Sequence, residues 1–68
     1  QLGEKQVRGF VFRSYVGDHP PMHVHVFRKG QQLGRWDIEH QRAMDELVVT
    51  KRLAQALKEA GYMFREDE

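Results

Sequence analysis

The sequence predicts a small α+β domain, in which an antiparallel sheet of three or four strands packs against one C-terminal helix. Three short segments rich in aromatic and β-branched residues are separated by glycine and proline, which is typical of strands joined by turns. One amphipathic segment with a good capping residue at each end follows them. These two observations define the fold class.

The length and composition predict a single domain over positions 1–68. The chain has 68 residues, of which 40% are hydrophobic and 31% are charged. We expect its ends, positions 1–6 and 65–68, to be frayed. A domain this small buries only about 60% of the surface that its unfolded chain exposes. A partner would therefore add to its stability.

The composition also limits the classes of function. The formal net charge of +1 argues against a protein that binds mainly through phosphate attraction. No apolar run is long enough for a membrane span or a secretory signal, so we expect a cytoplasmic protein with no membrane partner. Because the chain has no cysteine, histidine and carboxylate side chains are the metal ligands that it offers.

The first predicted strand is Val7–Val16. Both of its faces are largely apolar, which is expected of a strand that is covered on each side. It ends at the turn formers Gly17 and Asp18. The following Pro20 and Pro21 cannot donate ladder hydrogen bonds, so we expect a stiff connection there.

The second and third predicted strands, Met22–Lys29 and Leu33–Glu39, form a hairpin around the loop Gly30–Gln32. A two-residue loop at Gly30–Gln31 is rejected, because it would mix the two faces of the hairpin. A loop of three residues gives a core face with two apolar pairs, Val24–Ile38 and Val26–Trp36. The other face then carries three pairs of a ring with a charged side chain, His23–Glu39, His25–Asp37 and Phe27–Arg35. On this register we expect Trp36 to be the main hydrophobic anchor of the core.

The predicted helix begins after the N-cap Thr50 and ends at Gly61, a good left-handed stop. Four apolar residues at helical spacing form a stripe that faces the sheet: Leu53, Ala54, Leu57 and Ala60. We expect Leu47–Val49 to form either a brief fourth strand or an extended lead-in to the helix. Tyr62–Phe64 should fold back over the helix end.

Three of the four histidines, His19, His23 and His25, lie in one short stretch beside Asp18. His23 and His25 are two positions apart on a strand, so they project from one face about 7 Å apart. The simplest interpretation is a set of cross-strand charge pairs or of contacts to a partner. A divalent-metal site is the alternative, with His23 and His25 as two ligands and His19 or Asp37 as the third. No other cofactor is indicated.

A further interpretation is a metal-independent ribonuclease or an RNA-binding toxin. A histidine beside a carboxylate has a pKa suited to a general base, and Arg35, Lys29 or Arg28 would supply the cation for a phosphate. Phe27 on the same face would stack on a base of a single strand. The sequence has no nucleophile motif and no phosphate-binding glycine loop, so enzymatic activity stays open.

The segment Asp18–Val26, which reads DHPPMHVHV, follows the segment GFVFRSY and resembles a signature of small bacterial proteins. Their family is classed as domain of unknown function 4160 and typically reads GIxIxMYxxDHPPPHFHV, followed by a hairpin and a helix. The resemblance extends over residues 8–28. Met22 replaces a third proline and Val24 an aromatic residue, and the downstream TGE and LP elements of the family are missing. The resemblance implies a toxin–antitoxin-like pair encoded by neighbouring genes.

Our leading hypothesis is therefore an interaction module of unknown biochemical activity. The surface that binds the partner would combine the loop with the histidine-bearing face of the sheet, through Asp18, His19, His23, His25, Phe27 and Arg35. The partner would be a protein, such as the product of a neighbouring gene. A homodimer and a nucleic-acid partner are the alternatives.

Overall fold

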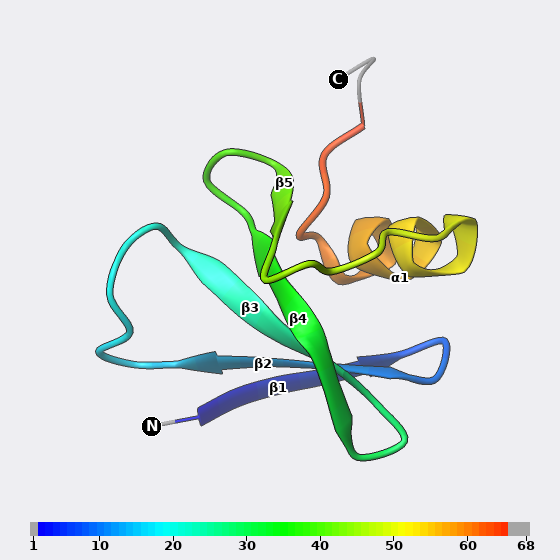
Figure 1. The fold of residues 1–68 in the computed structure, drawn as a ribbon, viewed down its shortest axis with the longest axis horizontal. Helices are drawn as coiled ribbons and strands as arrows, with labels where there is room; N and C mark the ends of the chain where they lie inside the picture. The colour runs from blue at the N-terminus through cyan, green and yellow to red at the C-terminus, as the bar shows by residue number, and fades with distance from the viewer. Residues whose placement is uncertain (1, 66–68) are drawn as a thin grey trace.

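The structure is a computed structural model, which describes residues 2–65. It forms one five-stranded antiparallel sheet and one helix (Figure 1). The elements are β1 (Leu2–Val7), β2 (Phe10–Tyr15), β3 (His23–Arg28), β4 (Gln31–Asp37), β5 (Arg42–Met44) and α1 (Lys51–Ala60). The strands neighbour one another in chain order. The α+β class and the C-terminal helix are confirmed, whereas the sheet has more strands than the predicted three or four.

The single strand predicted over Val7–Val16 is wrong, because two strands and a tight turn occupy this region. Arg8 and Gly9 both have positive φ, 52° and 84°, as a two-residue hairpin turn requires. The turn pairs Val7 with Phe10 and folds the chain before it into β1. Residues 2–6, which were expected to be frayed, are therefore paired along their length with β2. Position 1 and positions 66–68 lie outside the described residues.

The predicted β3–β4 register is also wrong. The turn consists of two residues, Lys29 and Gly30, both with positive φ, and the ladder shifts by one residue between Val26 and Phe27. With the two-residue turn alone, core side chains of β3 would lie opposite outward-facing side chains of β4. The extra residue of this β-bulge brings the core side chains of the two strands opposite each other again. The pairs formed are Val24–Trp36, Val26–Gly34, His23–Asp37 and His25–Arg35. They replace the predicted pairs Val24–Ile38, Val26–Trp36, His23–Glu39, His25–Asp37 and Phe27–Arg35.

The observed β3–β4 register differs from the predicted one by two residues. A shift by an even number leaves each side chain on its predicted face. Val24, Val26 and Trp36 therefore still lie together in the core, as predicted.

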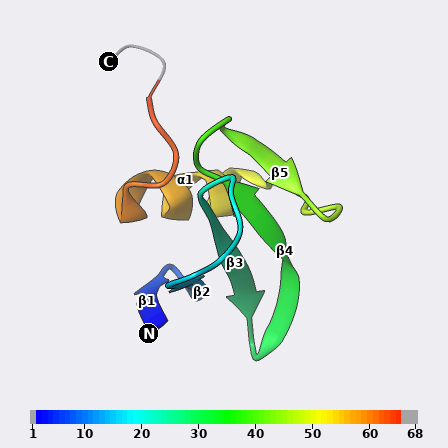
Figure 2. The ribbon, with the colours of Figure 1, turned by 90° about the vertical axis from the view of Figure 1, so that its left-hand side faces the viewer.

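The core lies between one face of the sheet and helix α1, which lies across one side of the strands (Figure 2). Its buried hydrophobic residues are Phe10, Phe12, Val24, Val26, Trp36, Leu47, Leu53, Ala56, Leu57 and Ala60. Trp36 is the predicted anchor, and its Nε1–H donates a hydrogen bond of 3.0 Å to the Tyr62 carbonyl oxygen. In the helix, Ala56 is buried and Ala54 is only half-buried, so the stripe is shifted slightly from the predicted one.

The helix ends are as predicted. The Thr50 hydroxyl accepts from the Leu53 N–H at 3.1 Å, and Gly61 adopts the left-handed conformation with φ of 87°. Residues 47–49 form an extended lead-in and not a strand. After the helix, Tyr62 and Met63 pack on the core, whereas Phe64 is exposed.

No helix within residues 2–65 is long and apolar enough to cross a membrane.

Candidate functional site

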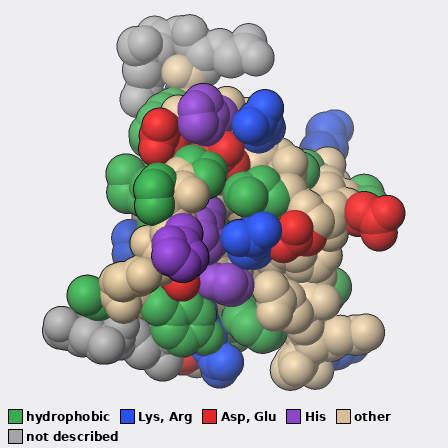
Figure 3. Space-filling model, turned by 60° about the vertical axis from the view of Figure 1, so that its left-hand side comes forward, with side chains coloured by type: hydrophobic (Ala, Val, Ile, Leu, Met, Phe, Trp, Pro, Cys, Tyr) green, Lys and Arg blue, Asp and Glu red, His purple; other side chains and the backbone are tan. Residues whose placement is uncertain are grey.

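One face of the sheet is left uncovered by the helix. Because side chains alternate along a strand, the neighbours of the buried core residues point to the opposite side. We call this surface the open face and define it by Val11, Arg13, Tyr15, His23, His25, Phe27, Arg35 and Met44. Figure 3 shows histidine side chains gathered beside hydrophobic and basic ones. The prediction that His23 and His25 share the side of the sheet away from Trp36 is confirmed.

The connection between β2 and β3 brings Asp18 to the open face. At its start, the Asp18 N–H donates to the Tyr15 carbonyl oxygen at 3.3 Å. At its end, the Met22 carbonyl oxygen accepts from the Ile38 N–H at 2.9 Å. The Pro20–Pro21 peptide bond between these anchors is cis. Both ends of the connection are thus held by hydrogen bonds.

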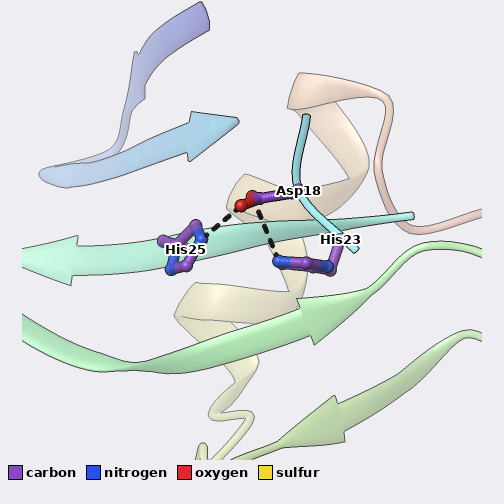
Figure 4. Close-up of side chains that lie close together, drawn as sticks. All are labelled: Asp18, His23 and His25. Carbon is purple, nitrogen blue, oxygen red and sulfur yellow. Dashed lines mark hydrogen bonds and ion pairs between the residues drawn. The ribbon is translucent and has the colours of Figure 1, made fainter. Parts of the chain in front are cut away.

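Asp18, His23 and His25 form a compact cluster (Figure 4). The Asp18 Oδ2 atom lies 3.3 Å from His23 Nε2 and 3.3 Å from His25 Nε2. One potential ligand atom from each of the three residues lies within 4.8 Å of the other two. The side chains are exposed to different degrees, 4% for His23, 19% for His25 and 36% for Asp18. His23 therefore forms the buried side of the cluster, and Asp18 forms its accessible side.

The structure places the two predicted third ligands elsewhere. Asp37 is fully buried, and its two carboxylate oxygens accept from the backbone N–H and from Nδ1 of His40, both at 2.9 Å. His19 is exposed beside the cluster and does not belong to the group of potential ligand atoms. The third member is instead Asp18, which the sequence indicated only as a contact to a partner.

Hydrogen bonds fix both imidazole rings from behind. His23 Nδ1 lies 2.7 Å from the Pro21 carbonyl oxygen, and since a carbonyl only accepts, Nδ1 carries the hydrogen. His25 Nδ1 lies 3.3 Å from Gln32 Nε2. The Tyr15 ring meets the His25 ring edge to face at 5.0 Å. Each ring therefore presents its Nε2 atom to Asp18.

The two arginines of the open face are engaged in ion pairs. Arg35 donates to Asp45, with a distance of 3.1 Å from Nη2 to Oδ1, and this hydrogen bond raises the pKa of Arg35 and lowers that of Asp45. Arg13 donates to Glu4 at 2.9 Å and lies 4.8 Å above the ring of Phe27. Neither guanidinium is left free for a phosphate.

A groove of about 350 Å³ runs beside the cluster. It is lined by apolar, polar and charged residues, namely Ser14, Tyr15, Asp18, His19, Pro20, Pro21, Met22, His23 and Glu39. A larger cavity of about 940 Å³ lies against α1 and residues 63–65. That cavity contains none of the clustered histidines.

The six residues predicted to bind a partner lie on the open face or in the groove beside it. His23, His25, Phe27 and Arg35 belong to the open face, while Asp18 and His19 line the groove. Sequence reasoning missed Tyr15, which touches His25 and also lines the groove. Its position in the alternation of β2 was the available signal, because Phe10 and Phe12 occupy the core positions.

Comparison with protein-family models, with curated proteins and with solved structures finds no match to this chain, so the family resemblance of residues 8–28 stays a prediction.

Proposed function

We propose that this chain is an interaction module that binds a protein partner through the groove and the adjoining open face. The observation that carries the proposal is the groove itself, in which apolar walls and two carboxylates lie next to an uncovered sheet face. A small domain gains stability when such a face is covered.

Apolar side chains around the groove support a protein as the occupant. Tyr15 is exposed in its wall, and Met22 and Val16 project into solvent from the connection. Phe27 and Val11 continue the apolar surface along the open face. Burial of such residues contributes about 25 cal/mol for each Å² of apolar surface. A partner segment with apolar side chains would gain this contribution.

Charge favours a protein over a nucleic acid. Asp18 and Glu39 line the groove, and both carboxylates would repel a phosphate. Arg13 and Arg35 are already paired with Glu4 and Asp45. A partner segment with a lysine or arginine next to apolar residues is complementary to this lining.

The same geometry disfavours a ribonuclease. The expected pairs of His23 with Glu39 and of His25 with Asp37 do not form in the described part of the chain. Of the three cations expected to stabilise a phosphate, Arg35 is bound to Asp45 and Arg28 lies over the ring of the core residue Phe10. The family resemblance supports a toxin–antitoxin-like partner, the product of a neighbouring gene.

Two matched substitutions test the proposal. Val16 and Val48 are each 75% exposed, but Val16 directly follows Tyr15, which lines the groove, whereas Val48 precedes α1. Binding of the purified neighbouring gene product is measured by calorimetry. We expect Val16→Asp to weaken binding about tenfold, since a charge placed in an apolar contact would cost about 1.4 kcal/mol or more, and Val48→Asp to leave it unchanged.

Two results would overturn the proposal. One is equal binding by the Val16→Asp and Val48→Asp proteins. The other is the absence of binding together with a monomeric state in sedimentation. Self-association that Val16→Asp abolishes would instead identify a second copy as the partner.

A further inference from the structure

We propose that Asp18, His23 and His25 bind one divalent first-row transition-metal ion, of which Zn²⁺ is the representative probe. This inference goes beyond the docking surface and does not depend on it. It rests on the spacing of the ligand atoms, on the hydrogen bonds of the two rings and on the burial of the cluster.

The spacing of the ligand atoms fits a tetrahedral ion. Ligand atoms about 2.0 to 2.1 Å from a common Zn²⁺ lie about 3.3 Å apart along the edges of the tetrahedron. Asp18 Oδ2 lies 3.3 Å from both His23 Nε2 and His25 Nε2. All three ligand atoms lie within 4.8 Å of one another, so one ion can approach all of them.

The hydrogen bond at Nδ1 of His23 determines which ring nitrogen faces Asp18. Its Nδ1–H donates to the Pro21 carbonyl oxygen, so Nε2 is the ring nitrogen that faces the Asp18 carboxylate, as a metal ligand would. A metal ion at this point accepts electron density from both groups.

Hydrogen bonds at the Nδ1 atoms hold the two rings in the orientation that a metal ion requires. Histidine ligands usually donate their other N–H to a carbonyl or carboxylate, as His23 does to Pro21. Gln32 contacts Nδ1 of His25, and its amide offers either a donor or an acceptor to that nitrogen. His23 is almost completely buried, so its ring cannot turn away into solvent. These contacts provide preorganisation that a chance pair of surface histidines lacks.

The ligand set indicates the class of metal. Two imidazole nitrogens and one carboxylate oxygen suit Zn²⁺ and its neighbours in the first row better than Mg²⁺ or Ca²⁺, which prefer oxygen ligands. Three protein ligands leave at least one coordination position for water or another ligand. The exposed carboxylate of Asp18, which also lines the groove, places that position on the accessible side.

The test measures metal binding by protein that carries no histidine tag. The protein is stripped with a chelator and titrated with ZnCl₂ by calorimetry, and then with Co²⁺, whose visible spectrum reports tetrahedral coordination. We expect one ion for each chain. Asp18→Asn changes an exposed side chain with little effect on folding, and we expect it to weaken binding about a hundredfold. His25→Gln should have a similar effect.

Two matched histidine variants serve as controls. His19 adjoins the cluster and His40 lies beside Asp37, so His19→Gln and His40→Gln should bind Zn²⁺ as the unmodified protein does. Nitrogen chemical shifts of the imidazoles provide a second measurement, in which Zn²⁺ should move the Nε2 signals of His23 and His25. The inference is overturned if Zn²⁺ does not bind at millimolar concentration. It is also overturned if Asp18→Asn binds unchanged or if His19→Gln causes the larger loss.

Discussion

Asp37 shows how one buried carboxylate stabilises the chain reversal between β4 and β5. Its oxygens accept from the backbone and the ring of His40, and the Arg42 guanidinium lies 3.4 Å from Oδ2. Every one of these partners lies in the turn that follows β4 or at the start of β5. Asp37 therefore stabilises the turn and does not belong to the histidine cluster, although it is the cross-strand neighbour of His23.

Substitution of Asp37 tests this role. Asp37→Ala leaves the His40 N–H without its acceptor inside the protein, and a lost buried partner is costly. We expect the melting temperature to fall by several degrees, measured by circular dichroism. Glu39→Ala, which removes an exposed carboxylate two positions away, is the control and should change it little. Equal effects of the two substitutions would contradict the assignment.

Asp37 also predicts a pH dependence of stability. Burial alone would raise the pKa of Asp37, but the hydrogen bonds from His40 and the charge of Arg42 outweigh it, so the pKa lies below its usual value. A lowered pKa in the folded state stabilises the protein above the unfolded pKa, and this contribution is lost as the pH falls through the folded value.

We therefore expect the stability difference between the unmodified protein and Asp37→Asn to be constant near neutral pH and to shrink below about pH 4. Urea unfolding at a series of pH values measures it. Parallel stability curves down to pH 2 would show that this carboxylate makes no such contribution.

At the level of residues, the sequence predicted which histidines lie together but not their acidic partner. Alternation along β3 sufficed to place His23 and His25 on one face. The approach of Asp18 depends on the path of the β2–β3 connection, which is determined by its anchoring to Tyr15 and Ile38. Local patterning carries no information about such a path.

Gly34 illustrates how β4 and the segment before the helix approach each other. A Cβ atom at Gly34 would lie 2.8 Å from Leu47 Cβ and 3.0 Å from the Met44 carbonyl oxygen. Its φ of 148° is also rarely adopted by other residues. The absence of a side chain at this position lets Leu47 reach the core.

Two glycine substitutions in the β3–β4 hairpin distinguish the effect of close packing from the effect of a positive φ. Gly30→Ala places a side chain in open space at a φ of 77°, at a cost of about 1 to 2 kcal/mol from the left-handed backbone alone. We expect Gly34→Ala to lower the free energy of unfolding by about 1 to 3 kcal/mol more than Gly30→Ala does, because Leu47 or the strand must shift. Urea unfolding measures both, and a smaller effect at Gly34 would contradict the close packing.

At the level of elements, the helix was predictable and the outer strands were not. The helix begins and ends at residues whose side chains or backbone freedom act locally, Thr50 and Gly61. In contrast, β1 and β5 are edge strands without a clear alternating pattern, and only pairing with β2 and β4 makes them strands. The bulge that changes the β3–β4 register lies beside Gly34, and an isolated glycine within a strand pattern was the available signal.

For the whole molecule, the role of β1 can be tested by truncation. Lys5 donates a hydrogen bond of 2.8 Å to the Ala60 carbonyl oxygen, so β1 contacts the helix end as well as β2. Deletion of residues 1–7 would remove these contacts and expose the edge of β2. We expect loss of cooperative thermal unfolding and association in sedimentation experiments. A monomeric truncated protein with an unchanged melting temperature would show that the segment is dispensable, as a frayed end would be.

The bulge in the β3–β4 hairpin has an evolutionary consequence. With a two-residue turn, the extra residue in β4 is what keeps Arg35 toward the open face and Trp36 toward the core. A homologous chain that lacks one residue of this hairpin would invert both side chains, unless an insertion elsewhere in the hairpin compensates. Insertions and deletions between β3 and the end of β4 should therefore occur in compensating pairs or in steps of two.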